Sequence, residues 1–100
     1  MVKKGIFVRL EAKSGQETAV EEFLNGGLSL VNEEPLTKTW YAVKFDDSTF
    51  GIFDTFDGEE GRDAHLNGKV AEALMANAGK LLAAPPKIEK VDILAVKSLS

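Results

Sequence analysis

The chain has 100 residues, of which 44% are hydrophobic and 28% are charged. These values suit one soluble globular domain spanning residues 1–100, and they exclude collagen-like, disordered and low-complexity proteins. The 12 basic and 16 acidic side chains give a net charge of −4, which argues against a nucleic-acid partner. The chain has no cysteine, so disulfides, thiolate nucleophiles and Cys-based zinc sites are excluded.

We expect a cytoplasmic protein. Cysteine-free short chains are typical of reducing compartments. The N-terminal residues alternate between apolar and charged, so they do not resemble a signal peptide. No stretch approaches the ~20 apolar residues that span a bilayer, so we expect no membrane contact.

The first half of the chain predicts a strand, a helix and a second strand. Residues 5–13 alternate between apolar and polar side chains, as in a half-buried strand. Ser14 and Glu17 have the spacing of a capping box and predict a helix start. Apolar residues continue at helical spacing to Val31, although Gly26 and Gly27 are expected to bend or end the last turn. Residues 37–46 are rich in β-branched and aromatic residues, which favours a strand.

The second half predicts a strand, a helix and a last strand. Residues 49–56 follow the turn at Asp46-Asp47-Ser48, so 37–46 and 49–56 should form a hairpin. Acidic residues at 57–60 favour a second helix start, and Asn67-Gly68 should break this helix. Asn77 and Gly79 favour its end. Residues 88–97 follow two prolines and predict a final strand.

This order of elements, βαββαβ, predicts an α+β ferredoxin-like fold: a four-stranded antiparallel sheet with two helices on one face. The predicted strands carry apolar residues on both faces, and a monomer rarely exposes a large apolar patch. We therefore expect the outer sheet face to be covered by a second copy, giving a homodimer.

Few residues carry recognisable chemistry. The chain lacks a phosphate-binding glycine loop, a G-x-S-x-G elbow and an H-E-x-x-H motif. His65, the single histidine, has the side chain best suited to proton transfer near neutral pH, although a lone histidine is more often structural. One histidine and dispersed carboxylates give no zinc spacing, so we expect no metal. Glu33-Glu34 and Glu59-Glu60 are adjacent pairs that diverge on a helix, which disfavours acid–base work.

An RNA-recognition module has the same order of elements and stacks bases on aromatic residues of its central strands. Residues 49–53 resemble one of its motifs, but Ile52 and Thr55 stand where aromatic residues are expected. The leading basic residue and glycine are missing too. Together with the acidic net charge, these differences disfavour RNA binding.

Five segments together carry a family resemblance, which extends over nearly the whole chain: residues 8–13 (VRLEAK), 39–42 (TWYA), 48–54 (STFGIFD), 64–68 (AHLNG) and 88–92 (IEKVD). Read together, they resemble the antibiotic-biosynthesis-monooxygenase-like family, and its small stand-alone bacterial members in particular. The resemblance implies a dimeric α/β barrel, in which two ferredoxin-like sheets pack face to face. It also implies oxidation of a small phenolic or quinol substrate by molecular oxygen, without a metal, flavin or haem.

The same resemblance suggests site residues. His65 would be the catalytic base or a substrate partner, with Asn67 as a polar contact. Trp40 or Phe53, together with Leu74 and Met75, would line a substrate cleft between the sheet and the helices. If a partner covers the outer face, the pocket must lie on this helix side.

Two functions stay open at this point. One is the cofactor-independent monooxygenase. The alternative is a homodimer of the same fold that binds a small molecule without catalysis, or that is associated with stress. Haem degradation is disfavoured, because the first strand lacks the asparagine of that branch and His65 is not clearly its haem-binding histidine.

Overall fold

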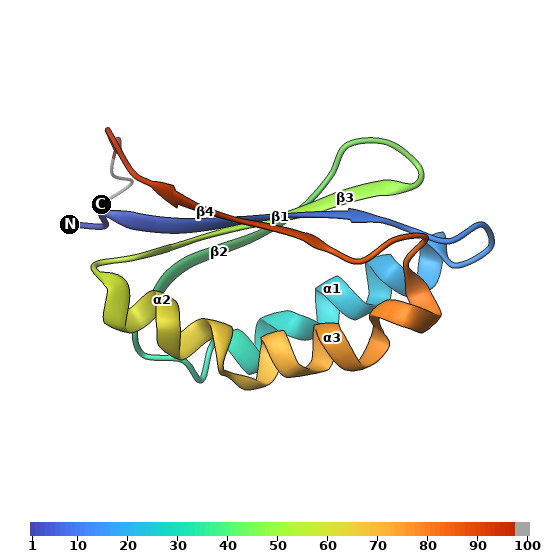
Figure 1. Cartoon of the computed structure of the whole chain (residues 1–100), viewed down its shortest axis with the longest axis horizontal. Coiled ribbons are helices and arrows are strands. Elements are labelled where there is room, and N and C mark those ends of the chain that lie inside the picture. Colours follow the sequence, from blue (N-terminus) through green and yellow to red (C-terminus); the bar gives the residue numbers. More distant parts are fainter. Residues whose placement is uncertain (98–100) are drawn as a thin grey trace.

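Four antiparallel strands form one sheet with all helices on one of its faces, in a computed structural model that describes residues 1–97 (Figure 1). The strands and helices are β1 (Lys4–Glu11), α1 (Glu17–Val31), β2 (Thr37–Lys44), β3 (Thr49–Phe56), α2 (Glu59–Leu66), α3 (Lys69–Leu81) and β4 (Lys87–Asp92). The predicted α+β ferredoxin-like order is confirmed. The predicted break at Asn67-Gly68 divides the second helical region into α2 and α3.

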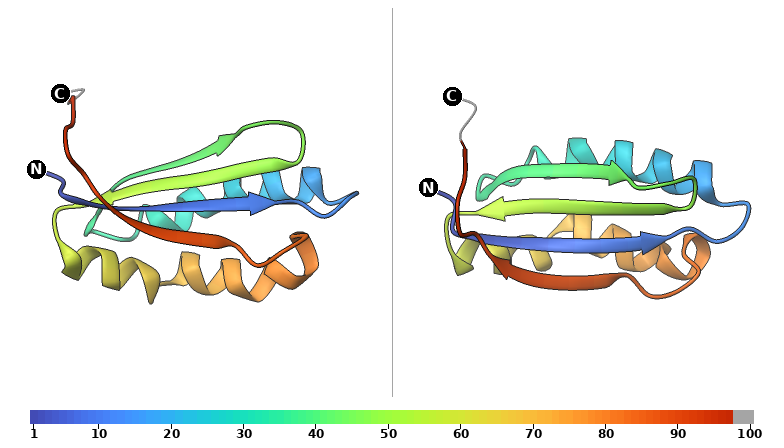
Figure 2. Two further views of the ribbon diagram at one scale, coloured as in Figure 1. Left: turned by 45° about the horizontal axis from the view of Figure 1, so that its top comes forward. Right: turned by 90° about the horizontal axis from the view of Figure 1, so that it is seen from above.

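The strand order in the sheet is β2-β3-β1-β4, and every neighbouring pair is antiparallel (Figure 2). Strands β1 and β3 are central, while β2 and β4 form the edges. The β2–β3 hairpin turns at Asp46, whose Oδ1 accepts hydrogen bonds from the backbone N–H groups of Ser48 (3.0 Å) and Thr49 (2.8 Å). This turn was predicted from the sequence.

The core lies between the sheet and the helices. Alternate residues of the two central strands face the helices and are almost completely buried, as the two-residue period of a strand requires. They pack against apolar residues of α1 and α3. The core cluster consists of Ile6, Val8, Leu10, Ala12, Val20, Leu24, Phe50, Ile52, Phe56, Leu74, Leu81 and Leu82.

Helix α1 continues through Gly26 and Gly27 to Val31, so the expectation of a non-helical last turn is wrong. A Cβ at position 27 would lie only 3.3 Å from the Trp40 ring, so the glycine gives this ring room to pack against the helix. The predicted capping box is also absent. Gly15 has φ +86°, the helix begins at Glu17, and its N-cap Gln16 makes no side-chain cap hydrogen bond.

Strand β4 is shorter than predicted, because it ends at Asp92 rather than Lys97. Asp92 pairs with Lys4, the first residue of β1, so the neighbouring strand offers no further ladder. One more hydrogen bond follows, from Ile93 N to Lys3 O (2.8 Å). Residues 93–97 then leave β4 and cross the outer sheet face near the start of β1 (Figures 1 and 2). Helix α3 in turn continues past Asn77 and Gly79 to Leu81, which is buried in the core.

Candidate functional site

His65 lies on α2 and points into the interface between α2, β3 and the loop that leads into β2. Its side chain is 8% exposed. Nδ1 lies 2.6 Å from Glu34 Oε1 and Nε2 lies 3.0 Å from Asp54 Oδ2. A carboxylate only accepts hydrogen bonds, so this geometry favours a ring with a proton on each nitrogen, the imidazolium.

The environment of His65 favours its charged form. Burial alone lowers the pKa of His65, but the interactions with Asp54 and Glu34 outweigh burial and raise this pKa above its ordinary value of 6.5. Asp54 is fully buried, and within residues 1–97 its only ion-pair partner is the ring of His65. A buried carboxylate without a counter-charge is costly, so the positive charge of His65 stabilises Asp54.

A cavity of about 230 Å³ borders this cluster between α2 and the α1–β2 loop. His65 and Glu34 form part of its wall, with Thr37 nearby, and the Thr37 hydroxyl donates to Glu34 Oε1 (2.7 Å). Both nitrogens of His65 are already engaged by carboxylates. In this arrangement the ring has no free nitrogen to offer a ligand in the cavity.

The other residues predicted for the helix-side cleft do not meet in one place. Trp40 faces the helices and packs against the core. Leu74 is buried within that core, whereas Met75 is 57% exposed. Asn67 is exposed at the α2–α3 break, where its side-chain N–H donates to Asp63 O (2.8 Å).

Phe53 lies on the opposite face of the sheet. It pairs with Tyr41 across β2 and β3, whereas Trp40 pairs with Asp54. Because side chains alternate along a strand, Phe53 and Trp40 point in opposite directions and cannot line one cleft. The sequence had also left open whether Trp40 or Tyr41 faces the helices, and the structure assigns Trp40 to that side.

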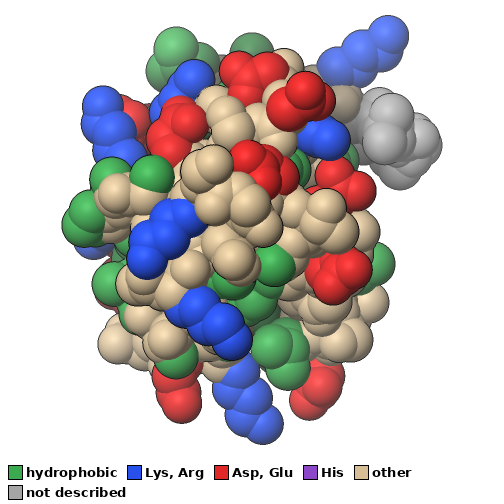
Figure 3. Space-filling view, turned by 90° about the vertical axis from the view of Figure 1, so that its right-hand side faces the viewer, with side chains coloured by type: hydrophobic (Ala, Val, Ile, Leu, Met, Phe, Trp, Pro, Cys, Tyr) green, Lys and Arg blue, Asp and Glu red, His purple; other side chains and the backbone are tan. Residues whose placement is uncertain are grey.

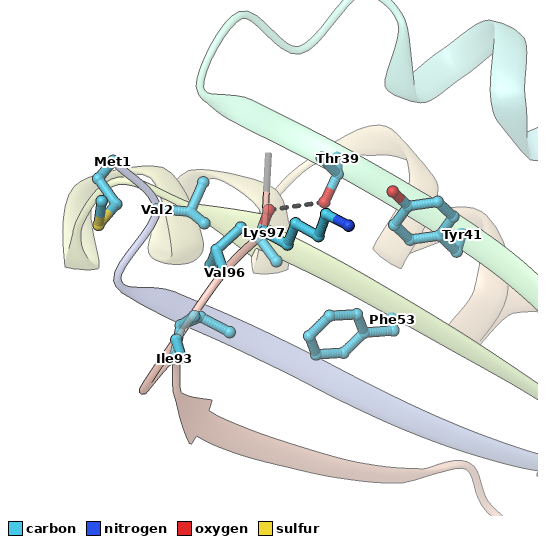
Figure 4. A pocket seen from close by; sticks show the side chains of 10 residues that line it. Met1, Val2, Thr39, Tyr41, Phe53, Ile93, Val96 and Lys97 are labelled. Atoms are coloured by element: carbon cyan, nitrogen blue, oxygen red, sulfur yellow. Dashed lines mark hydrogen bonds between the residues drawn. The ribbon is translucent and has the colours of Figure 1, made fainter. Parts of the chain in front are cut away.

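A cavity of about 690 Å³ lies on the outer sheet face, in addition to the helix-side cavity beside His65. Its floor is formed by side chains of β2 and β3, and one wall by residues 93–97 where they cross the sheet (Figure 4). We call it the outer-face pocket. Its lining residues are Met1, Val2, Thr39, Tyr41, Phe53, Thr55, Ile93, Ala95, Val96 and Lys97.

The polar groups of the outer-face pocket are few and close together. Thr39 Oγ1 and Thr55 Oγ1 are 2.6 Å apart across β2 and β3, with either one as the donor. The Tyr41 hydroxyl lies at one side, and the Lys97 side chain extends toward it in Figure 4. A mainly apolar cavity of a few hundred Å³ with a few polar groups is typical of small-molecule sites.

On the end of the molecule in Figure 3, basic and acidic side chains are interspersed rather than gathered by sign. Within residues 1–97, no helix is long and apolar enough to cross a membrane, and no group of three His, Asp or Glu side chains has an arrangement that could hold a metal ion. Glu34 and Asp54 contact opposite sides of the His65 ring, so they do not converge on a common point.

No family model matches the chain, and neither does any curated protein. Among solved structures, the chain is similar to NE2512, a protein of unknown function from Nitrosomonas europaea. The two share 57% sequence identity with a TM-score of 0.97, over 100% of this chain and 97% of that chain. The chain belongs to the NE2512 family. Its function therefore has to be inferred from the chemistry of the candidate sites.

More distant structures share the fold. Rv0793 from Mycobacterium tuberculosis has 15% identity and a TM-score of 0.83, covering 96% of this chain and 99% of that chain. A "putative antibiotic biosynthesis monooxygenase" from Nitrosomonas europaea has 15% identity and a TM-score of 0.81, covering 92% and 99%. The resemblance to antibiotic-biosynthesis-monooxygenase-like proteins is thus confirmed as a likeness of fold.

The sequence analysis did not identify several residues of the His65 cluster and of the outer-face pocket. The burial of Asp54 could have been predicted from the sequence, because the two-residue period of β3 places it on the same face as Phe50, Ile52 and Phe56. A carboxylate on that buried face needs a partner. Glu34 was considered only as half of an adjacent pair. Lys97 was assigned to a strand, and nothing in the sequence indicates that its segment crosses the sheet.

Proposed function

We propose that the protein is a cofactor-independent monooxygenase that oxidises a small phenolic or quinol substrate with molecular oxygen. The observation that carries this proposal is the outer-face pocket, with the rings of Tyr41 and Phe53 beside the Thr39–Thr55 hydroxyl pair. Aromatic rings stack on a planar substrate, and hydroxyls hold its oxygen atoms. The chain shares its fold with structures named "putative antibiotic biosynthesis monooxygenase", which supports a proposal of the same reaction class.

The reaction needs no reductant besides the substrate. A deprotonated quinol ring donates electrons to O₂, and a new C–O bond forms while the O–O bond breaks. One oxygen atom stays on the ring and the other leaves as water with two hydrogens from the substrate. For a quinol the products are a hydroxyquinone and water, and the ring is oxidised as O₂ is reduced. The protein has to supply a water-poor pocket and hydrogen bonds that stabilise the developing charge.

We propose in addition that the protein is a homodimer in which a second copy covers the outer sheet face. Tyr41 and Val43 on β2 and Phe45 directly after it are 50%, 40% and 52% exposed, and Leu94 in the crossing segment is 97% exposed. Two ferredoxin-like sheets packed face to face would bury these side chains. The partner sheet would also close the open side of the outer-face pocket and exclude water from it.

Oxygen consumption tests the monooxygenase. Wild-type protein is screened in an oxygen electrode with menadiol-type quinols and dihydroxyaromatics, beside Phe53→Ala and His65→Gln. We expect Phe53→Ala to lower kcat/KM about tenfold, because it removes one aromatic wall. Leu28→Ala, at an exposed position of α1 away from the pocket, is the control and should match wild type. Equal consumption by wild type and His65→Gln would remove His65 from the mechanism.

A non-catalytic small-molecule-binding dimer is the second candidate. It is favoured by one observation: among the described residues that line the outer-face pocket, none is a carboxylate or an imidazole that would serve as a base. Ligand binding without any oxygen consumption across the screen would support this candidate and reject the monooxygenase.

A further inference from the structure

We infer that the outer-face pocket selects ligands with an ionised oxygen, and that Lys97 pairs with that oxygen. The inference deepens the proposed function, on which it rests for the class of ligand, because it names the charge state in which the aromatic compound binds. It assigns to Lys97 a role in binding and specificity.

The lining of the pocket carries one sign of charge. Lys97 has the only side chain among the described lining residues that is charged at neutral pH; the remaining side chains are apolar, hydroxyl or phenol groups. Within residues 1–97, Lys97 forms no ion pair with a carboxylate. The ammonium group is therefore available, as far as these residues are concerned, to a negatively charged ligand atom.

The position of Lys97 follows from the path of the chain after β4. Residues 93–97 leave the sheet edge and cross the outer face, so that Ile93, Val96 and Lys97 line one side of the pocket and Phe53 of β3 lies beside them (Figure 4). The Lys97 side chain extends toward the Tyr41 side in this view. A planar ligand lying on Phe53 would thus have an ammonium group at its edge.

The hydroxyl pair complements this charge. Each threonine hydroxyl has one hydrogen, and one of them is used between Thr39 and Thr55 at 2.6 Å. The pair keeps one hydrogen to donate and several lone pairs to accept with. It therefore suits a second, uncharged oxygen of the ligand, such as the other hydroxyl of a quinol.

A positive charge at an apolar wall changes the ionisation of a bound phenol. An opposite charge within a few ångströms favours the ionised form, so the phenol pKa of the ligand falls on binding. The phenolate is the form that donates an electron to O₂. Lys97 would then contribute both to the choice of ligand and to its reactivity.

The test uses a matched pair of probes, 4-nitrophenol and its uncharged analogue nitrobenzene. The visible absorption of 4-nitrophenol reports whether the bound ligand is ionised. We expect wild type to prefer the phenolate and to lower the pKa of bound 4-nitrophenol. Lys97→Met should weaken phenolate binding about fivefold, the scale of one partly exposed ion pair, and remove the pKa change. Nitrobenzene binding should stay unchanged, and the phenolate preference of wild type should weaken as salt rises.

Lys87→Met serves as the control, because Lys87 is an exposed lysine on β4 whose Nζ pairs with Glu89 (3.7 Å). It should bind both probes like wild type. Equal phenolate binding by wild type and Lys97→Met would overturn the inference, and so would a wild type that binds neither probe. The proposed oxidation is judged separately, by oxygen consumption: selective phenolate binding without turnover would keep this inference and reject the monooxygenase.

Discussion

His65 is the residue whose surroundings are most unusual for its type. It joins three segments that are far apart in the chain, since its two nitrogens contact Glu34 before β2 and Asp54 on β3. The phenyl ring of Phe56 packs beside it with ring centroids 5.5 Å apart. Together these contacts give His65 a clear structural role, whatever its part in catalysis.

The charge of His65 predicts how stability depends on pH. Its pKa is raised on folding, because the contacts with Asp54 and Glu34 outweigh the opposing effect of burial. The stabilisation is therefore complete below the unfolded value of about 6.5 and is lost as pH rises through the higher folded value. Urea unfolding between about pH 5.5 and pH 9 should show His65→Gln destabilised by about 3 kcal/mol at the acidic end. The difference from wild type should shrink as pH rises.

Glu34→Gln is the companion variant, because it keeps the imidazole and its contact with Asp54 while it removes one charge. It should fold, and it should show a smaller loss of stability with rising pH than wild type. A difference between wild type and His65→Gln that stays constant over the whole pH range would show that the pKa of His65 is not raised on folding.

The sequence could predict that His65 mattered but not what surrounds it. Glu34 and Asp54 are 31 and 11 positions away, and only the packing of α2 on β3 and the α1–β2 loop brings them together. Phe53 illustrates the same limit. The alternation of side chains in β2 and β3 was readable, but the cross-strand register that pairs Phe53 with Tyr41 was not.

At the scale of an element, α1 shows how two adjacent glycines have different roles. Gly27 faces the sheet and leaves room for Trp40, whereas a Cβ at Gly26 would meet nothing within 4 Å. The cost of a glycine in a helix is the same at both positions, so the local sequence gives them equal weight. Only the packing of the Trp40 ring distinguishes them.

The two positions predict opposite outcomes for alanine. Gly26→Ala should raise the free energy of unfolding by up to about 1 kcal/mol, because alanine lowers the entropy cost of forming the helix. Gly27→Ala should gain less or lose stability, since its methyl group would press on the Trp40 ring, and Gly27→Val should be clearly destabilised. Thermal unfolding of the three variants against wild type measures the difference. Equal gains in stability from Gly26→Ala and Gly27→Ala would show that the Trp40 ring can move aside without a measurable cost.

The element ends were harder to predict than the elements themselves. The hairpin and the break at Asn67-Gly68 could be read from turn residues, which act locally. The end of β4 could not, because it depends on where β1 begins to offer partners. The start of α1 was misread since Gly15 turns the chain before Ser14 can act as a cap.

At the scale of the whole molecule, the two faces of the sheet differ in what covers them. One face is covered by helices, while the other exposes Phe45 with Phe7 packed edge to face against it (centroids 6.4 Å) and Arg9 over its ring at 4.7 Å. This aromatic group lies on the same face as the outer-face pocket. A partner that covers one would approach the other.

A single charge on this face should prevent the proposed dimer. We expect sedimentation to find about twice the monomer mass for wild type and monomer or aggregate for Phe45→Asp, because the variant loses an apolar ring from the interface and its carboxylate would have to be desolvated even where it pairs with Arg9. Leu28→Asp is the matched control: Leu28 is 50% exposed on the helix side and Phe45 is 52% exposed. It should remain a dimer. A soluble wild-type monomer at micromolar concentration would reject the dimer.

The contact between Gly27 and Trp40 has a practical consequence. Trp40 is the only tryptophan in the chain, and it lies between α1 and the sheet rather than at the outer-face pocket. Its fluorescence therefore reports whether the helical layer is attached to the sheet. A ligand or a second copy on the outer face should leave that emission nearly unchanged. The protein thus carries an intrinsic optical probe that separates unfolding from binding in one sample.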